Sequence, residues 1–186
     1  SVTELAQRLG VNRTVVYRLV TTLEGHALVR RDSKARLHIG LGVLQLASGV
    51  QPVLRDQALP VLRRLAEDTG CTAHLTVADG EEALALAVVE PSWTGFHVAY
   101  RVGARHPLQQ GAAGKAILLG RRRERVPFAL TSGELQSGAR GLAAPVLGVD
   151  GLEASVGIVT IGASIDESVV GPQVVAAAGA IASRLA

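Results

Sequence analysis

The sequence contains one cysteine in 186 residues, so no internal disulfide can form. A chain without disulfides fits a reducing compartment, and we therefore expect a cytoplasmic protein. Aromatic residues make up only 3% of the chain, too few for the stacking platforms that bind RNA or single strands. No apolar run approaches the roughly 18 residues of a membrane span. Together these features exclude a disulfide scaffold and predict no membrane partner.

The chain also lacks the usual marks of an enzyme. Its five histidines are scattered without metal-ligand spacing, so we expect no metal site. Cys71 and His74 could suggest a nucleophile and its base, but in a strand residues three apart point to opposite faces. We expect Cys71 to be a small core residue. The sequence therefore predicts no catalytic residue and no cofactor.

Two short helical patterns open the chain. In the first, Thr3 is the expected N-cap and Gly10 ends the helix. In the second, Asn12 is the expected N-cap and Gly25 ends the helix. The residues expected to face inward are Val2, Leu5, Ala6 and Leu9 in the first helix and Val15, Val16, Leu19, Val20 and Leu23 in the second.

The outward face of the second helix is polar and basic. Its side chains donate hydrogen bonds and have the spacing of a recognition helix in the major groove of DNA. A strand-like pattern follows over 27–31 and 36–39 around a polar turn at 32–34, which is typical of a basic wing. The residues predicted to contact DNA are Thr3, Asn12, Arg13, Thr14, Tyr17 and Arg18 from the helices and Arg30, Arg31, Lys34 and Arg36 from the wing.

Charge gives an independent argument for a DNA partner. Residues 1–40 contain seven Lys or Arg against three Asp or Glu, whereas the remainder contains twelve against thirteen. The net charge of +3 therefore arises entirely in this segment. Basic side chains gain affinity for DNA by releasing its condensed counterions. The alternative is a solvated basic surface on a small helical hairpin.

The rest of the chain predicts a linker helix over 41–53 and a second domain over 54–186. The domain begins with an amphipathic helix that Pro60 is expected to kink or restart and that Gly70 ends. Paired strands flanked by helices imply an α+β domain with a mostly antiparallel sheet. We expect strands at 72–78, 83–89, 97–100, 141–147 and 154–161, a helical turn or two at 114–120, and a closing helix at 172–185.

A glycine-rich stretch at 111–115 resembles a phosphate loop. Gln109 and Ala116 stand where the Walker pattern requires Gly and Ser or Thr, so that motif is absent. Small residues before a helix can still expose backbone N–H groups to a small anion. A tight turn without a ligand is an equal alternative from the residues alone. The charge run at 121–125 favours a solvated helix end.

Four segments in this order resemble the IclR-type transcriptional regulators: TELA at 3–6, NRTVVYRL at 12–19, GAAGKA at 111–116 and GLAAPV at 141–146. The resemblance covers nearly the whole chain. It implies a winged helix-turn-helix followed by a GAF-like effector domain. It also implies a homodimer, or a dimer of dimers, that reads a palindromic double-stranded DNA operator and responds to a small metabolite, commonly an organic acid.

The resemblance also places the ligand. Backbone N–H groups of Gly111, Ala112, Ala113 and Gly114 are expected to hold its carboxylate, and further contacts are expected near Thr131, Gly141, Val159 and Ile161. These four are less polar than in some relatives, so we expect a more apolar effector than a bare two- or three-carbon acid.

The sequence departs from the family pattern in two places. Winged modules usually have another helix before the first one here, and the family has a longer segment, with a Leu- and Glu-rich helix, where Gly120 runs almost directly to Phe128. We expect missing residues before Ser1 and near 121–126. Two other functions remain open: a DNA-binding oligomer that senses nothing, and a small-molecule enzyme with a fused winged helix.

Overall fold

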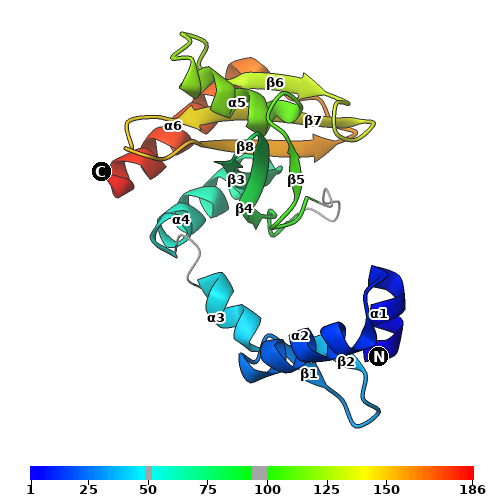
Figure 1. The fold of residues 1–186 in the computed structure, drawn as a ribbon. Helices are drawn as coiled ribbons and strands as arrows, with labels where there is room; N and C mark the ends of the chain where they lie inside the picture. Colours follow the sequence, from blue (N-terminus) through cyan, green and yellow to red (C-terminus); the bar gives the residue numbers. More distant parts are fainter. Residues whose placement is uncertain (49–51, 94–99) are drawn as a thin grey trace. The chain divides into compact units, whose positions relative to one another are not determined.

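The computed structural model describes residues 1–48, 52–93 and 100–186. The chain divides into two compact units, Ser1–Pro52 and Val53–Ala186, and each is described here by itself (Figure 1). The first unit contains three helices and a two-stranded hairpin. Its elements are α1 (Val2–Leu9), α2 (Arg13–Gly25), β1 (Val29–Arg31), β2 (Leu37–Ile39) and α3 (Gly42–Ser48).

The cap of α1 differs from the predicted one. Ser1 is the N-cap, its hydroxyl accepting a hydrogen bond from the Glu4 N–H while the Glu4 carboxylate accepts from the Ser1 amino group. This is a capping box, which satisfies two donors at once. Thr3 lies inside the helix, so its assignment as N-cap was wrong. Gly10 ends α1 in the left-handed conformation, with φ of 65°, as the pattern predicted.

The core of the first unit is small. Ala6, Val16 and Val20 are buried, and apolar side chains of α1, β1 and β2 pack around them. Val15, Leu19 and Leu23 were predicted to face inward but are exposed. They form a second stripe on α2, about 100° around the helix from the buried one. The described elements of this unit cover only one of the two stripes.

The second unit contains one six-stranded antiparallel sheet, which confirms the predicted α+β class. In sheet order the strands are β5 (Arg105–Pro107), β4 (Glu82–Val89), β3 (Thr72–Asp79), β8 (Ala154–Ile161), β7 (Ala139–Val146) and β6 (Ala129–Ser132). Both predicted hairpins, β3–β4 and β7–β8, are present, and β3 pairs with β8 at the centre.

Two strands were not predicted, and one predicted strand cannot be compared. The edge strands β5 and β6 have only three and four residues, too few to show an alternating pattern. The strand expected at 97–100 lies outside the described residues except for Tyr100, which is not in a strand.

Helices cover both faces of the sheet. α4 (Pro52–Thr69) and α6 (Glu167–Leu185) pack on one face through side chains such as Leu62 and Ile181. α5 (Gly111–Arg121) packs on the other through Ala112 and Ala116 (Figure 1). Alternation along β3 sends Leu75 to the first face and His74 to the second. The second face holds the pocket described below.

Three helix boundaries differ from the predicted ones. α4 runs without a break through Pro60, and α5 begins at Gly111, three residues before the predicted start. α6 begins at Glu167, because Asp166 caps it by accepting from the Ser168 N–H. Pro172 therefore lies inside α6, and its assignment as the helix start was wrong. Of the predicted linker helix, the structure shows α3 and the first residues of α4, while 49–51 lie outside the described residues.

By length and composition, α6 could cross a membrane, with a mean hydropathy of 1.2. The sequence itself predicted no membrane span. Val174, Ala177, Ala178 and Ile181 are buried in the main core beside β7 and β8. Packing against the sheet thus buries one side of this helix, whereas 28% of its apolar stretch as a whole is buried, and Val169 and Val175 are exposed.

Candidate nucleic-acid interface and ligand pocket

The predicted DNA-contact residues of α2 lie on its exposed face. Asn12 caps the helix, its side-chain oxygen accepting from the Thr14 N–H at 2.8 Å. Arg13 and Arg18 are exposed, and neither forms an ion pair within the described residues. Tyr17 is about half exposed. The helix therefore presents two uncompensated cations and a phenol on its exposed surface.

The wing divides its four cations into two kinds. Arg30 and Lys34 are exposed, with side chains free of ion pairs in the described part of the chain. Arg31 instead contacts the Glu24 carboxylate at 3.0 Å, and its guanidinium lies 5.3 Å from the centre of the Tyr17 ring. This contact joins the wing to α2. Arg31 therefore has a structural role that the sequence did not reveal.

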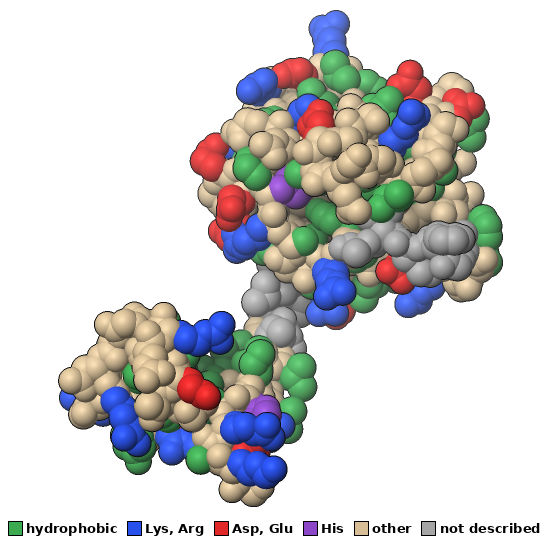
Figure 2. All heavy atoms as spheres, turned by 90° about the vertical axis from the view of Figure 1, so that its right-hand side faces the viewer, with side chains coloured by type: hydrophobic (Ala, Val, Ile, Leu, Met, Phe, Trp, Pro, Cys, Tyr) green, Lys and Arg blue, Asp and Glu red, His purple; other side chains and the backbone are tan. Residues whose placement is uncertain are grey.

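Asp32 organises the turn of the wing. It accepts backbone N–H bonds from Arg36 and Lys34 and side-chain contacts from Arg36 and His38. The backbone bond from Arg36 and the contact with His38 hold the pKa of Asp32 well below its usual range. Arg36 is thus partly neutralised inside the wing. Lys and Arg side chains spread over this unit, with few acidic ones among them (Figure 2).

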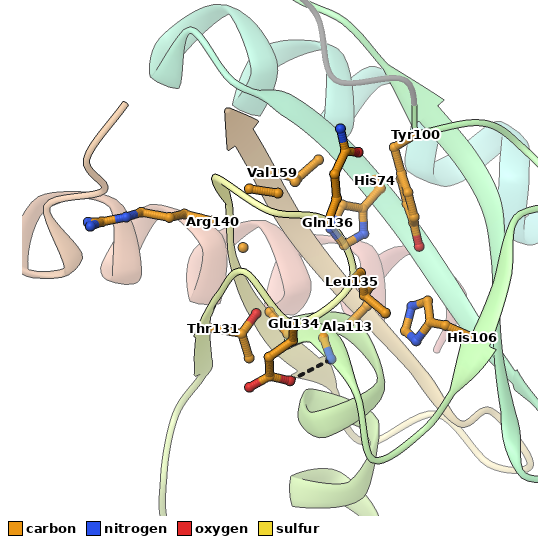
Figure 3. A pocket seen from close by; sticks show the side chains of 14 residues that line it. His74, Tyr100, His106, Ala113, Thr131, Glu134, Leu135, Gln136, Arg140 and Val159 are labelled. Atoms are coloured by element: carbon orange, nitrogen blue, oxygen red, sulfur yellow. Dashed lines mark hydrogen bonds between the residues drawn. The ribbon is translucent and has the colours of Figure 1, made fainter. Parts of the chain in front are cut away.

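The second unit contains a pocket of about 80 Å³ at the amino end of α5 (Figure 3). Its walls come from α5, β3, β5, β6, β7, β8, the loop between β6 and β7, and Tyr100 before β5. Six predicted ligand residues line it: Gly111, Ala112, Ala113, Thr131, Gly141 and Val159. Lining residues that the sequence analysis did not assign to the ligand are His74, Tyr100, His106, Glu134, Leu135, Gln136, Ala139 and Arg140.

Two predicted ligand residues do not line the pocket. Ile161 lies at the exposed end of β8. Gly114 lies in the first turn of α5, where an added Cβ would come within 2.5 Å of the Leu108 carbonyl oxygen. The glycine therefore permits close packing of the helix on the segment before it. Ser155, fully buried in β8, fixes the same turn by donating to the Ala113 carbonyl at 3.0 Å.

A carboxylate of the chain itself occupies the amino end of α5. The Gly111 N–H donates to Glu134 Oε2 at 2.9 Å (Figure 3). Lys115 pairs with the other oxygen of Glu134. The hydrogen bond from Lys115, followed by that from Gly111, lowers the pKa of Glu134. A positive helix end favours such an anion. Glu134 thus makes the contact that the sequence analysis expected of a ligand carboxylate.

Two buried histidines form much of the remaining wall. His74 Nδ1 lies 3.2 Å from Thr76 Oγ1, and the ring contacts Tyr100 edge-to-face at 5.1 Å between centres. Burial, with a smaller contribution from nearby His106, lowers the pKa of His74 to about 3, so it is uncharged at neutral pH. In the sequence, the sign of this polar wall is the pair His74 and Thr76, two polar residues on one face of a largely apolar strand.

Other candidates from the sequence lie away from the pocket. Cys71 packs against the main core, as predicted, and donates to the Thr69 carbonyl. In the charge run, Arg121 pairs with Glu153 at 2.8 Å. Among the described residues, no group of three or more His, Cys, Asp or Glu could hold a metal ion.

Comparisons with known proteins identify the family. The model "IclR helix-turn-helix domain" matches residues 1–33, and the model "Bacterial transcriptional regulator IclR C-terminal" matches residues 50–137. Among curated relatives, the HTH-type transcriptional regulator BhcR of Paracoccus denitrificans is 33% identical over 121 residues, covering 63% of this chain and 43% of that protein. The HTH-type transcriptional regulator KipR of Bacillus subtilis is 30% identical over 139 residues, covering 74% and 55%. The chain thus spans about half the length of these relatives.

Solved structures share the fold. An IclR regulator from Alicyclobacillus acidocaldarius has a TM-score of 0.83 at 23% identity, covering all of this chain and 90% of that one. An IclR homolog from Microbacterium hydrocarbonoxydans, solved in complex with 4-hydroxybenzoate, has a TM-score of 0.84 at 18% identity, with the same coverage. Two family models that match successive parts of the sequence, together with these relatives, show that the chain belongs to the IclR family of bacterial transcriptional regulators.

Proposed function

We propose that this chain is a DNA-binding transcriptional regulator whose operator affinity depends on a small molecule bound in the second unit. The observation that carries the proposal is the exposed set of uncompensated cations on α2 and the wing. Cations that lack a carboxylate partner are free to neutralise phosphates. The net basic charge of this segment supports the same function.

The structure suggests different roles for the predicted DNA contacts. Arg13 and Arg18 would reach base edges or flanking phosphates in the major groove, and Arg30 and Lys34 would contact the backbone or minor groove. The other predicted contacts are expected to orient the interface or donate to phosphates near it: Thr3, Asn12, Thr14, Tyr17, Arg31 and Arg36.

The pocket beside α5 is the proposed sensor. A relative of the same fold was solved with 4-hydroxybenzoate, and the cavity here has apolar walls with a few buried polar atoms, which is typical of small-molecule sites. A ligand that binds two conformations with different affinity shifts the population between them. We propose that the shift alters how two copies of the chain fit the half-sites of a palindromic operator in the bacterial cytoplasm, without catalysis.

Selection of bound duplexes from a random DNA pool tests the DNA-binding half. Arg18→Ala and Arg30→Ala are expected to weaken binding, and Arg18→Ala to relax the sequence preference if it reads a base. Arg63→Ala is the matched control, because it removes the same charge from an exposed position of α4 in the second unit. Equal binding by all three variants and the parent chain would refute the assignment.

Ligand screening tests the sensing half. A molecule that binds only the folded protein raises its unfolding temperature. Molecules found in this way are then added to the operator titration. A hit that leaves operator affinity unchanged supports the alternative in which the second unit is only an oligomerisation scaffold.

A further inference from the structure

One wall of the pocket presents a buried hydrogen-bond acceptor. His106 extends from β5 and is only 7% exposed. Its Nδ1 lies 3.1 Å from the Pro107 carbonyl oxygen. A carbonyl can only accept, so Nδ1 carries the hydrogen, and in the uncharged ring Nε2 is then a bare acceptor. A hydrogen-bond donor on a ligand at this wall can therefore pair with Nε2.

Nε2 of His106 has no hydrogen-bond partner among the described residues, although it is buried, whereas the Tyr100 hydroxyl lies near the side chain of Thr76. Both side chains line the pocket, where Figure 3 shows them on the same side. Buried polar atoms without partners are rare in folded proteins because leaving them unpaired costs stability. Nε2 of His106 therefore indicates where a ligand supplies a polar contact.

The opposite end of the pocket disfavours an anion. Glu134 already accepts from the Gly111 N–H and pairs with Lys115. A ligand carboxylate placed there would lie beside an existing carboxylate whose countercharge is already engaged. Burying a charge without a partner is costly.

No other Lys or Arg in the described part of the pocket compensates for a ligand carboxylate. Arg140 is the one Lys or Arg among the described lining residues, and its side chain extends away from the other labelled side chains in Figure 3. His74 is buried and uncharged at neutral pH. The remaining walls are largely small and apolar, for example Ala112 and Val159.

We propose that the ligand of this pocket is a small uncharged molecule that donates a hydrogen bond, from an amide N–H or a hydroxyl group, to Nε2 of His106. The inference rests on the proposed sensing function and specifies the chemical class that this site accepts. It replaces the carboxylate implied by the family resemblance, since Glu134 fills that position. The cavity of about 80 Å³ is smaller than the roughly 150 Å³ cavity that takes up benzene, so short branched molecules are the appropriate probes.

Three probes of equal size separate charge from hydrogen-bond donation. Isobutyramide is uncharged and donates, 3-methyl-2-butanone is uncharged and cannot donate, and isobutyrate is charged and cannot donate. Dissociation constants are measured on the full chain at neutral pH by calorimetry or by ligand-dependent shifts of the unfolding temperature. We expect the amide to bind on the order of tenfold more tightly than the ketone, because only the amide satisfies Nε2, and isobutyrate to bind more weakly than the amide.

Two variants assign the effects to residues. His106→Phe keeps an aromatic ring but removes the acceptor, so the preference for amide over ketone is expected to vanish. Glu134→Gln keeps the shape and can still accept from the Gly111 N–H, but it frees the charge of Lys115. It should raise the affinity for isobutyrate and leave the preference for amide over ketone unchanged.

If His106→Phe does not fold, the nitrogen-15 resonance of Nε2 in the parent chain gives the same information, because it moves when a donor binds. Isobutyrate or the ketone binding the parent chain as tightly as the amide would overturn the proposal, as would an Nε2 resonance that millimolar amide does not shift. If the amide bound most tightly of the three probes but left operator affinity unchanged, the result would support this ligand class and refute sensing. If isobutyrate bound more tightly than the amide and also changed operator affinity, the result would support sensing and refute this ligand class.

Discussion

Arg30→Ala should lower DNA affinity most strongly at low salt, whereas Arg31→Ala should change the salt dependence little. The two residues are neighbours in β1, but only Arg31 is engaged within the chain, by Glu24 at 3.0 Å and by the ring of Tyr17. A guanidinium that already neutralises a carboxylate releases few counterions from DNA. The pair therefore compares a free cation with an engaged one on the same strand.

The size of the expected change in salt dependence follows from the number of cations that form no ion pair within the chain. Each phosphate neutralised on duplex DNA adds about −0.9 to the slope of log affinity against log salt. Arg13, Arg18, Arg30 and Lys34 are the predicted contacts whose side chains form no ion pair among the described residues. If each meets one phosphate, the slope is about −3.6 per copy of the chain, and Arg30→Ala reduces it to about −2.7.

Fluorescence anisotropy of a labelled duplex, titrated at several salt concentrations, measures these slopes. Circular dichroism of each variant checks that the first unit remains folded. An Arg30→Ala slope equal to that of the parent chain, or an equal loss for Arg31→Ala, would refute the division of the wing into free and engaged cations.

Four further predictions concern stability, each measured by urea or thermal unfolding. Gly114→Ala should destabilise the chain by about 1–3 kcal/mol, because its Cβ would lie 2.5 Å from the Leu108 carbonyl oxygen. Gly179→Ala, with no heavy atom within 4 Å of the new Cβ, should stabilise α6 by about 0.5–1 kcal/mol. Burial holds the pKa of His74 near 3 rather than 6.5, so only the unfolded chain binds this proton between those values; stability should fall as pH drops through that window, and less so in His74→Asn. Arg121 lowers the pKa of Glu153 below its ordinary 4.5, so the destabilisation by Glu153→Gln should be present above pH 4.5 and disappear as pH falls through the lowered pKa.

Local signals in the sequence predicted much of the fold. Asn12 before a helical pattern located the start of α2, and alternating residues around Asp79–Gly80 located the hairpin of β3 and β4. The hydrophobic pattern failed to predict burial where burial depends on which other elements pack against a helix. Val15 and Leu19 fit an inward face as well as Val16 does, but the described elements cover only the stripe that contains Val16.

The pocket was predictable only in part. The small residues at 111–113 marked one wall, because a helix start after a tight turn is a local feature. His106 lies in a three-residue edge strand, and Glu134 lies in a loop. Their approach to α5 depends on long-range pairing of β5 with β4 and of β6 with β7, which no local pattern reveals.

The coupling between the two sites is the central claim, and one titration tests it most directly. Operator affinity is measured without ligand and at saturating concentration of a molecule that raises the unfolding temperature of the chain. The account predicts a change of about fivefold or more, with an equal change in ligand affinity when the operator is bound. Identical operator affinities with and without the bound ligand would contradict it.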